Sequence, residues 1–442
     1  MNKKKKAFVA AAVAVASVAA LSGCAGAGGD PEGTIDYWLW DANQLPGYRQ
    51  CAEDFNAANP DLNVKITQLG WDDYWSKLTN GMVAENAPDV FTNHLAKYPN
   101  YLRFDQLVPL DDTNLDFDQY ADGLADLWVG QDGKRYGVPK DWDTIALFYN
   151  EDMADDAGIS AKEMADLDWN PDDGGTFEQA IAHLTVDKNG VRGDEAGFDK
   201  SKVAVYGLGL AGSGGGTGQT EWSWLTGTTG WTHTNKNPWG DQYNYDDPRF
   251  QATIAWWAGL IDKGYMPRLE TTIGASMPDN FGAGRAAINA NGSWMIGQYT
   301  GYDGVNVAIA PTPVGPEGAR SSMFNGLGDS IWVGTDNLEG SKRWVEYLGS
   351  TACQDVVGDK GVVFPAILSS TDNAVEAYRE RGINVDAFTE QVTDKTTFLF
   401  PITEDAATIE GIMKPAIDAV LTGQADVDSL TQANDRVNAL FK

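Results

Sequence analysis

The 442-residue chain carries 63 acidic side chains against 32 basic ones, a formal net charge of −31 at pH 7. Such an acidic surface repels nucleic acid and anionic lipid headgroups, which excludes nucleic acid as the main partner. Hydrophobic residues make up 43% of the chain, and its length exceeds the size at which a single core usually stops growing. We therefore expect two well-packed domains.

The first 23 residues resemble a removable leader. Lysines at positions 3–6 precede the apolar stretch 7–20, which is too short to span a bilayer, and then the tetrapeptide Leu-Ser-Gly-Cys. This tetrapeptide resembles a bacterial lipobox, in which cleavage leaves an amino-terminal Cys24 that carries lipid. The Gly-rich residues 24–33 suit a flexible tether. The mature chain keeps 28 basic and 63 acidic side chains, a charge of −35. It should sit outside the cytoplasmic membrane, attached through lipid alone.

Two cysteines remain in the mature chain. Cys51 and Cys353 both fall in amphipathic helical patterns, where a cysteine can be a small core residue, but an oxidising location would also allow them to pair. The sequence leaves both interpretations open. The three histidines are scattered along the chain, so no metal site is indicated. The glycine run 212–216 lacks the ending of a phosphate-binding loop, and no cofactor is expected.

Strands and helices alternate from the start of the mature chain. Residue patterns predict strands at 34–40, 63–69 and 87–91, with helical patterns after the first two. A βαβαβ start predicts a mainly parallel sheet whose carboxyl edge carries the ligand-facing loops. At that edge four polar or aromatic residues would converge, namely Trp40, Asp41, Asn93 and His94.

The stretch from Lys134 to Met153 joins polar residues to a buried strand. Residues 140–143 supply two carboxylates and a tryptophan, and the apolar run 144–149 favours a strand. Polar groups at the mouth of a strand are typical of a ligand-binding loop.

The later part of the chain continues both patterns. Further strands are predicted at 203–210, 286–290, 305–310 and 324–333, the last with Asp329 inside it. Amphipathic helices are predicted at 248–263, 341–357, 406–421 and 428–441.

Seven tryptophans avoid helix stripes and stand beside Asp, Asn or Glu: Trp40, Trp71, Trp142, Trp222, Trp224, Trp231 and Trp294. A sugar ring has apolar faces and a rim of hydroxyls, so it binds to a flat aromatic platform ringed by carboxylates. Few basic residues stand in these loops, which argues against an anionic ligand. A cation such as a polyamine suits the same residue types, so neutral sugar is the preferred ligand and polyamine the alternative.

An enzyme would need a recognisable catalytic arrangement. The sequence has no nucleophile elbow, zincin motif or Cys–His arrangement. A glycoside hydrolase needs two carboxylates at a fixed separation, and the many Asp and Glu residues do not single out such a pair. We expect a binding protein, with an extracellular glycosidase as a distant alternative.

Several short motifs, taken in order, resemble the family 1 extracellular solute-binding proteins of ABC importers, the class that includes maltodextrin-binding proteins. The match covers nearly all of the mature chain. Its motifs are Ala87-Pro88-Asp89-Val90, Tyr136-Gly137-Val138-Pro139, Leu147-Phe148-Tyr149-Asn150, Phe281-x-x-Gly284-x-Ala286-Ala287, Gly292-Ser293-Trp294 and Pro311-Thr312-Pro313-Val314-Gly315.

The resemblance implies an α/β, two-lobe periplasmic-binding-protein fold of type II. Three hinge crossings near residues 140, 325 and 362 would join the lobes, with ligand in the cleft between them. Lobe one would comprise residues 34–139 plus 327–361, and lobe two residues 140–326 plus 362–442. The resemblance also implies sugar contacts for Asp143, for the Asn93–His94 loop and for Trp294 as a stacking platform. Ser293 replaces a proline of the maltodextrin-binding proteins, so maltose is not implied.

We therefore predict a monomeric, lipid-anchored subunit that closes on a mono- or oligosaccharide and delivers it to an ABC permease. The alternatives are the same scaffold binding a polyamine or other non-sugar solute, and a glycoside hydrolase. The candidate ligand-binding residues are Trp40, Asp41, Asn93, His94, Asp143, Trp222, Trp224, Trp294 and Asp329.

Overall fold

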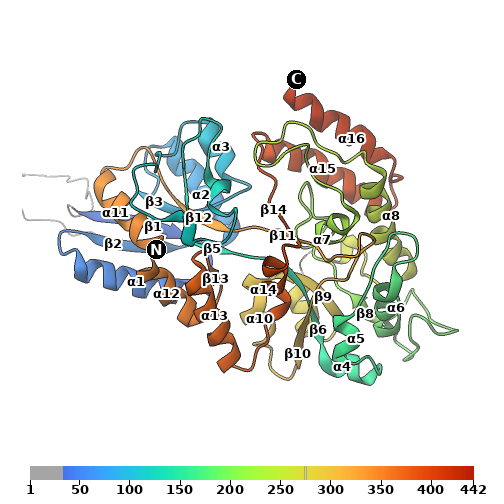
Figure 1. Ribbon diagram of the computed structural model, residues 1–442. Coiled ribbons are helices and arrows are strands. Elements are labelled where there is room, and N and C mark those ends of the chain that lie inside the picture. Colours follow the sequence, from blue (N-terminus) through green and yellow to red (C-terminus); the bar gives the residue numbers. More distant parts are fainter. Residues whose placement is uncertain (1–32, 273, 275) are drawn as a thin grey trace, which may run out of the picture. The chain divides into compact units, whose positions relative to one another are not determined.

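The computed structural model describes residues 33–272, 274 and 276–442 (Figure 1). The predicted leader, Cys24 and the tether up to residue 32 lie outside the described residues. Within the part of the chain that is described, no helix is both long and apolar enough to cross a membrane.

The first sheet has five strands in the order β2-β1-β3-β12-β4. Its strands are β1 (Thr34–Leu39), β2 (Asn63–Gln68), β3 (Val90–His94), β4 (Val138–Pro139) and β12 (Leu327–Ile331). The first three are parallel, as expected from the alternation of strands with α1 (Leu45–Ala58) and α2 (Trp71–Val83). β12 returns from far along the chain and pairs antiparallel with β3 and β4. The prediction of a mainly parallel sheet is therefore wrong, because the sheet contains both parallel and antiparallel pairs.

The second sheet has the order β10-β6-β9-β8-β7. Its strands are β6 (Ile145–Asn150), β7 (Val186–Asp187), β8 (Val203–Leu208), β9 (Ala286–Gly292) and β10 (Val307–Ala310). Only β8 and β9 are parallel. Every residue of β6 and β9 is buried, which explains why β6 appears in the sequence as a continuous apolar run.

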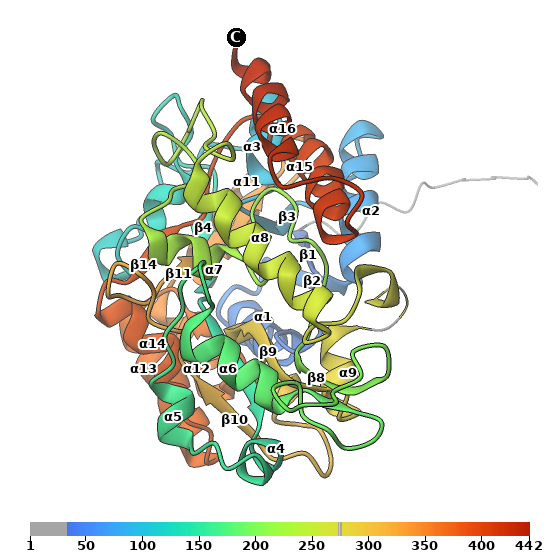
Figure 2. The same cartoon turned by 90° about the vertical axis from the view of Figure 1, so that its right-hand side faces the viewer.

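The remaining elements cover these sheets and connect them. The helices are α3 (Tyr98–Arg103), α4 (Glu151–Asp156), α5 (Ala161–Ala165), α6 (Gly175–Leu184), α7 (Ser223–Thr226), α8 (Pro248–Lys263), α9 (Met277–Gly282), α10 (Ile296–Tyr299), α11 (Leu338–Leu348), α12 (Thr351–Lys360), α13 (Leu368–Glu380), α14 (Asp386–Thr393), α15 (Ala406–Leu421) and α16 (Ser429–Asn438). The short strands are β5 (Asp141–Trp142), β11 (Ser322–Phe324), β13 (Phe364–Pro365) and β14 (Thr397–Leu399). Figure 2 shows the side of the molecule on which α6, α8, α15 and α16 face the viewer.

Two predicted elements are each divided in the structure. The predicted helix 341–357 is two helices, α11 and α12, because Ser350 has an extended backbone and Tyr120 donates a hydrogen bond to the carbonyl of Gly349 at the break. The predicted strand 324–333 is also two strands, β11 and β12. Between them Asn325 pairs with Asp143 through two backbone hydrogen bonds.

Three chain segments lie side by side between the two sheets. The backbone N–H of Lys140 donates to Leu327, that of Asp143 donates to Asn325, and that of Ala366 donates to Lys140, at 2.9, 2.8 and 3.1 Å. In Figure 1 the short strands β5 and β13 mark this region. The two sheets and these crossings make the two-lobe fold that the resemblance implied.

The strands of the two sheets fall within the residue ranges predicted for lobes one and two respectively. One helix packs differently from those ranges. α13 belongs to the range assigned to lobe two, yet it packs along α12 of lobe one, and Ser370 donates to Asp355 at 2.6 Å. The exact lobe boundaries stay a prediction.

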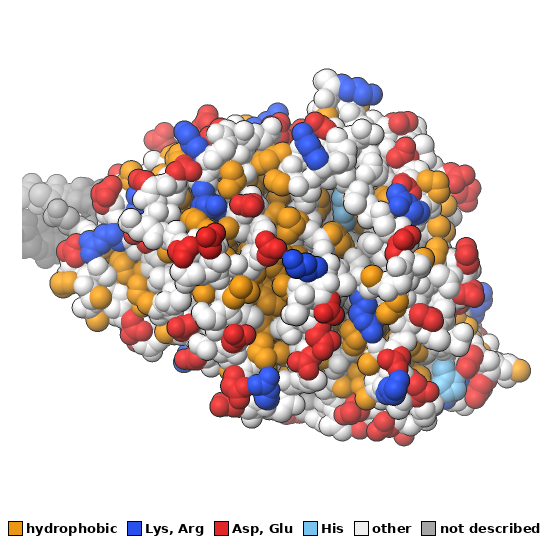
Figure 3. Space-filling model, viewed as in Figure 1, with side chains coloured by type: hydrophobic (Ala, Val, Ile, Leu, Met, Phe, Trp, Pro, Cys, Tyr) orange, Lys and Arg blue, Asp and Glu red, His pale blue; other side chains and the backbone are white. Residues whose placement is uncertain are grey.

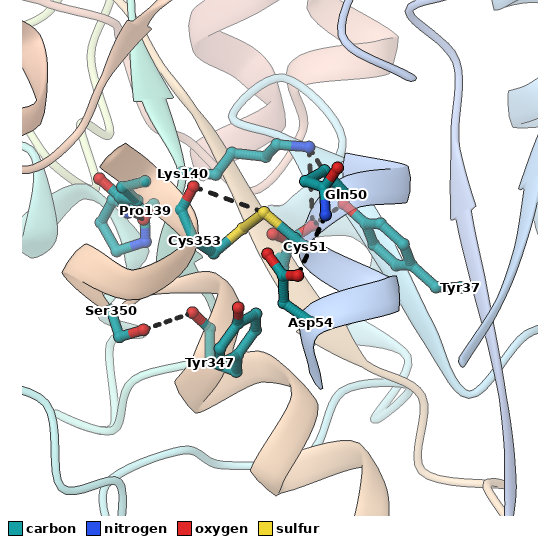
Figure 4. The surroundings of a disulfide bond; sticks show 11 residues. Tyr37, Gln50, Cys51, Asp54, Pro139, Lys140, Tyr347, Ser350 and Cys353 are labelled. Atoms are coloured by element: carbon teal, nitrogen blue, oxygen red, sulfur yellow. Dashed lines mark hydrogen bonds and ion pairs between the residues drawn. A yellow bond between two sulfur atoms is a disulfide. The ribbon is translucent and has the colours of Figure 1, made fainter. Parts of the chain in front are cut away.

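A disulfide fastens the first lobe close to the crossings. Cys51 of α1 and Cys353 of α12 are bonded, with their Cα atoms 5.3 Å apart and a separation of 302 positions in the sequence (Figure 4). Both sulfurs lie in a buried cluster that includes Tyr37, Trp344 and Val357. The pairing that the sequence left open is thus present.

Candidate functional site

A pocket of about 630 Å³ lies where the two lobes meet. This volume is within the range of roughly 300–1,000 Å³ that is usual for small-molecule sites. Its aromatic lining comprises Trp40, Trp71, His94, Trp142, Trp294 and Phe400, and its polar lining includes Asp41, Asn43, Gln44, Asp141, Asp143, Gln219, Thr220 and Asn325. None of the described residues that line it is a lysine or arginine.

Two carboxylates reach the pocket from the first crossing. Asp143 accepts hydrogen bonds from the side-chain amides of Gln219 and Asn325, at 2.7 and 3.1 Å. Asp141 accepts from Gln44 at 3.1 Å and from the backbone N–H of Leu327 at 2.9 Å. Burial raises the pKa of Asp141 to about 6 and raises that of Asp143 well above its usual value. Neutral hydrogen-bond donors from other segments of the chain therefore fix each of these two carboxylates in place.

A third carboxylate comes from the first lobe. Asp41 is the second residue after β1, and its side chain accepts a 2.8 Å hydrogen bond from the backbone N–H of Asn43. Burial raises the pKa of Asp41 as well. The loop after β1 thus places Asp41 at the pocket. This agrees with the prediction that the carboxyl edge of the first sheet carries the ligand-facing loops.

An aromatic wall stands beside Asp41. The Trp40 ring lies 5.1 Å from that of Trp71, 5.2 Å from that of Trp75 and 6.5 Å from that of His94. Trp71 begins α2 and is 45% exposed. Because Trp40 and Trp75 hold it, Trp71 presents a large apolar face to solvent at low cost in side-chain freedom.

His94 contributes a neutral hydrogen-bond donor to this wall. Burial lowers its pKa to about 3, and its Nδ1 accepts the backbone N–H of Ala96 at 3.0 Å. The ring proton is therefore on Nε2, so this nitrogen can donate to a hydroxyl or carbonyl oxygen.

Trp294 supplies the second lobe's aromatic face. It follows β9, is partly exposed and sits in a 3-10 turn that the Ser293 N–H fixes by donating to Thr144. Its ring folds back over Gly292: a Cβ on that glycine would lie 1.8 Å from the indole. The Gly-Ser-Trp motif thus needs glycine at its first position for the tryptophan to take this orientation.

Two predicted tryptophans do not reach the pocket. Trp222 and Trp224 are 0% and 1% exposed in the core of the second lobe. Their indole N–H groups donate to the carbonyls of Ser213 and Thr220. The preceding loop folds over them, so they support residues 217–220 rather than contact ligand.

Asn93 and Asp329 are also buried behind the pocket. Asn93 donates to Ser330 and accepts the N–H of His94, so it positions the histidine. Asp329 accepts hydrogen bonds from Tyr37 and Thr92 and lies 4.0 Å from the Nζ of Lys140. Because Lys140 and Asp329 are 2% and 1% exposed, this pair belongs to the interior beside the first crossing.

The structure therefore brings together five of the nine candidates, namely Trp40, Asp41, His94, Asp143 and Trp294. Asp141 was missed, although it stands in the loop that the sequence singled out. Trp71 was recognised only as a tryptophan outside a helix stripe. Gln219, Asn325 and Phe400 carry no local signal, because only the meeting of the lobes brings them to the pocket.

Residues 50–381 match the family model described as bacterial extracellular solute-binding protein. The chain belongs to that family. The predicted membership of the extracellular solute-binding proteins is thereby confirmed. Individual relatives in this class are also similar in sequence. A maltooligosaccharide ABC transporter solute-binding lipoprotein of Streptococcus pneumoniae serotype 4 is 26% identical over 407 residues, 89% of this chain and 86% of that protein. A lactose-binding protein of Rhizobium radiobacter is 29% identical over 31% of this chain, and that match spans only 34% of the relative.

Solved structures show the same fold. The ABC substrate-binding protein Lmo0181 from Listeria monocytogenes, in complex with cycloalternan, superposes with a TM-score of 0.77 at 19% identity, covering 92% of this chain and 98% of that one. The GacH receptor of Streptomyces glaucescens gives a TM-score of 0.73 at 21% identity, covering 93% of this chain and 99% of that one.

Proposed function

We propose that this solute-binding protein captures a neutral mono- or oligosaccharide outside the cell and delivers it to an ABC permease without chemical change. The observation that carries the proposal is the lining of the pocket. Partly exposed indoles stand on both lobes, Trp71 and Trp294, three carboxylates line the same pocket, and no basic side chain does so among the described residues. An aromatic face covers the apolar side of a sugar ring while carboxylates accept its hydroxyls.

The hydrogen-bonding groups of the pocket suit the mixed character of a hydroxyl, which both donates and accepts. Asp41, Asp141 and Asp143 are acceptors, and His94 offers a donor. Gln219 and Asn325 are already oriented by Asp143, so little side-chain freedom is lost on binding. The binding partners named for the relatives, maltooligosaccharide and lactose, are of this chemical class.

A cationic solute is the second candidate, and one observation favours it. Burial disfavours the charged forms of the three carboxylates in the pocket, and an ammonium group would relieve that cost while contacting the indoles. A polyamine would therefore fit the same walls. Sugar is preferred because both oxygens of Asp143 already bind neutral amides.

We further propose that the mature chain is a monomer anchored by lipid on Cys24 at the outer face of the cytoplasmic membrane. The lipobox-like tetrapeptide and the basic start of the chain support this location. The relative from Streptococcus pneumoniae is itself named a lipoprotein.

A thermal-shift panel on the purified full-length protein tests the proposed function. Neutral oligosaccharides that raise the melting temperature and are recovered intact support it, because a ligand that binds only the folded state stabilises by mass action, by about 2.7 kcal/mol at 100 times Kd. Stabilisation by spermidine instead would support the cationic alternative. Release of new reducing ends would indicate a glycosidase.

A further inference from the structure

The loop of residues 232–242, which we call the Trp239 loop, reaches from the second lobe to the first. Its base is fixed on the second lobe: Thr234 pairs with Tyr243, whose backbone N–H donates to Asn438 of α16 at 2.7 Å. At its tip the indole N–H of Trp239 donates to the carbonyl of Val129 at 2.9 Å. Val129 follows the 3-10 turn at 125–128 of the first lobe.

The contact is aromatic as well as polar. The Trp239 ring lies 5.8 Å from that of Tyr98 at an interplanar angle of 68°, a T-shaped arrangement. The hydroxyl of Tyr98 donates to the same Val129 carbonyl at 3.1 Å. Both lone pairs of that carbonyl are therefore used, one by a residue of each lobe.

The backbone of Trp239 is held in an unusual conformation. Its φ is +63°, in the left-handed region that bulky residues seldom adopt. Hydrogen bonds from the N–H groups of Trp239 and Gly240 to the carbonyl of Ile402, at 2.8 and 3.2 Å, fix it. A conformation of this kind persists where the surroundings determine it, and such positions concentrate at functional sites.

The same loop supports one wall of the pocket. The Asn237 amide donates to the carbonyls of Leu399 and Phe400, at 3.0 and 2.8 Å, and accepts the N–H of Ile402. The Phe400 ring in turn makes a T-shaped contact with that of His94, with the ring centres 5.7 Å apart, and both rings line the pocket. Trp239 therefore ties the segment that carries Phe400 to the lobe that carries His94.

Ion pairing continues this line of contacts. Arg103, at the end of α3, pairs with Asp405 before α15 at 2.7 Å, and Gln131 donates to Glu404. Arg103 is 53% exposed, so this pair contributes little by itself. Among these contacts between the lobes, the partly buried indole of Trp239 is therefore the main one.

We propose that Trp239 is a positioning residue that acts as a catch between the lobes, separate from the crossings, and slows the release of bound ligand. Trp239 stands outside the residues that line the pocket; it holds Phe400 against His94 and biases the lobes toward the closed arrangement. These contacts join protein groups to one another, so we expect the catch to act in the ligand-free protein too. Its effect on release rests on the proposed function.

The test compares Trp239→Ala and Trp239→Phe with Lys236→Ala in the full-length protein. Lys236 is exposed on the same loop and has no part in the contacts with the first lobe. We expect Trp239→Ala to increase the ligand-free radius of gyration, measured by small-angle X-ray scattering, and Trp239→Phe, which keeps the ring but loses the N–H, to increase it less. Lys236→Ala should match the wild type. Far-UV circular dichroism checks that each variant is folded.

The second readout uses maltotriose as the probe in stopped-flow fluorescence. Trp239→Ala should release it about tenfold faster with an unchanged association rate, the effect of losing one partly buried hydrogen bond together with the ring contact. Unchanged scattering and release in a folded Trp239→Ala protein would overturn the catch. If the wild type binds no sugar but Trp239→Ala still expands, the catch stands and the proposed function fails.

Discussion

At the scale of single residues, the surroundings of a tryptophan decide whether it can bind ligand. Helical spacing marks Trp257 as a packing residue, and it is 2% exposed in the core. Trp222 and Trp224 avoid such spacing, yet the loop before them covers both rings. Trp71 and Trp294 avoid it too and remain accessible. Sequence spacing therefore identifies helix-packed rings but not rings that a loop buries.

The indole of Trp294 should account for much of the affinity. We expect Trp294→Ala to weaken sugar binding at least tenfold, because a stacking anchor of this size contributes about 2 kcal/mol or more, and to change the melting temperature little. The matched substitution Trp169→Phe should do the reverse, because Trp169 is 2% exposed in the core of the same lobe and stands outside the pocket lining, so the change disturbs only packing. Titration calorimetry and thermal melts measure both. Equal affinity of Trp294→Ala and wild type would remove Trp294 from the site.

The buried carboxylate of Asp141 should make stability depend on pH. Burial raises its pKa to about 6 in the folded protein, against roughly 3.9 in the unfolded chain. Its contribution to stability is thus complete below the unfolded pKa and is lost as pH rises through about 6. We expect the melting temperature of the wild type, relative to that of Asp141→Asn, to fall between pH 4.5 and 7.5. A constant difference over that range would contradict the assignment.

At the scale of elements, local patterns predicted most strands and helices but missed two interruptions. The start of the first sheet, β6 and α15 follow their residue patterns closely. The breaks at Gly349–Ser350 and at Asn325–Gly326 depend on distant partners, Tyr120 and Asp143. The antiparallel entry of β12 likewise depends on how the chain returns through the crossings. A single stretch of sequence contains none of this information.

The disulfide between α1 and α12 should stabilise the fold without contributing to binding. α12 also braces the crossings, since Gln354 donates to the carbonyl of Pro139 and accepts the N–H of Ile367. We expect the double substitution Cys51→Ser and Cys353→Ser to lower the free energy of unfolding by about 3–5 kcal/mol. Urea titrations measure this loss, and the sugar affinity well below the melting temperature should stay unchanged. If the double variant unfolded at the same urea concentration as the wild type, the disulfide would contribute nothing to stability.

At the scale of the whole molecule, the pocket depends on residues far apart in the chain. The sequence selected residues at the ends of β1, β3 and β9 and in the first crossing, and the structure places five of them in the pocket lining, because strand ends are visible in residue patterns. It did not select Gln219, Asn325 or Phe400, which reach the pocket only when the two lobes are placed together. The acidic composition is visible at the surface, because Asp and Glu side chains, drawn in red, are spread over the face shown in Figure 3.

The attachment of the whole protein to the membrane should depend on one atom, the sulfur of Cys24. In a bacterial host we expect the full chain to partition into the detergent phase of a Triton X-114 extraction, and Cys24→Ser to fail to do so, because the proposed anchor is lipid rather than a membrane span. Mass spectrometry of the mature amino terminus provides the second readout. Partitioning that does not change with Cys24→Ser would contradict lipid anchoring at this residue.

The proposed function requires that indoles and carboxylates from both lobes bind an uncharged carbohydrate. Isothermal titration of the full-length protein against a library of neutral oligosaccharides, with putrescine and spermidine alongside, tests it most directly. We predict saturable one-to-one binding of at least one neutral glycan and none of the polyamines. Binding of a polyamine with no response to any neutral glycan would contradict the account.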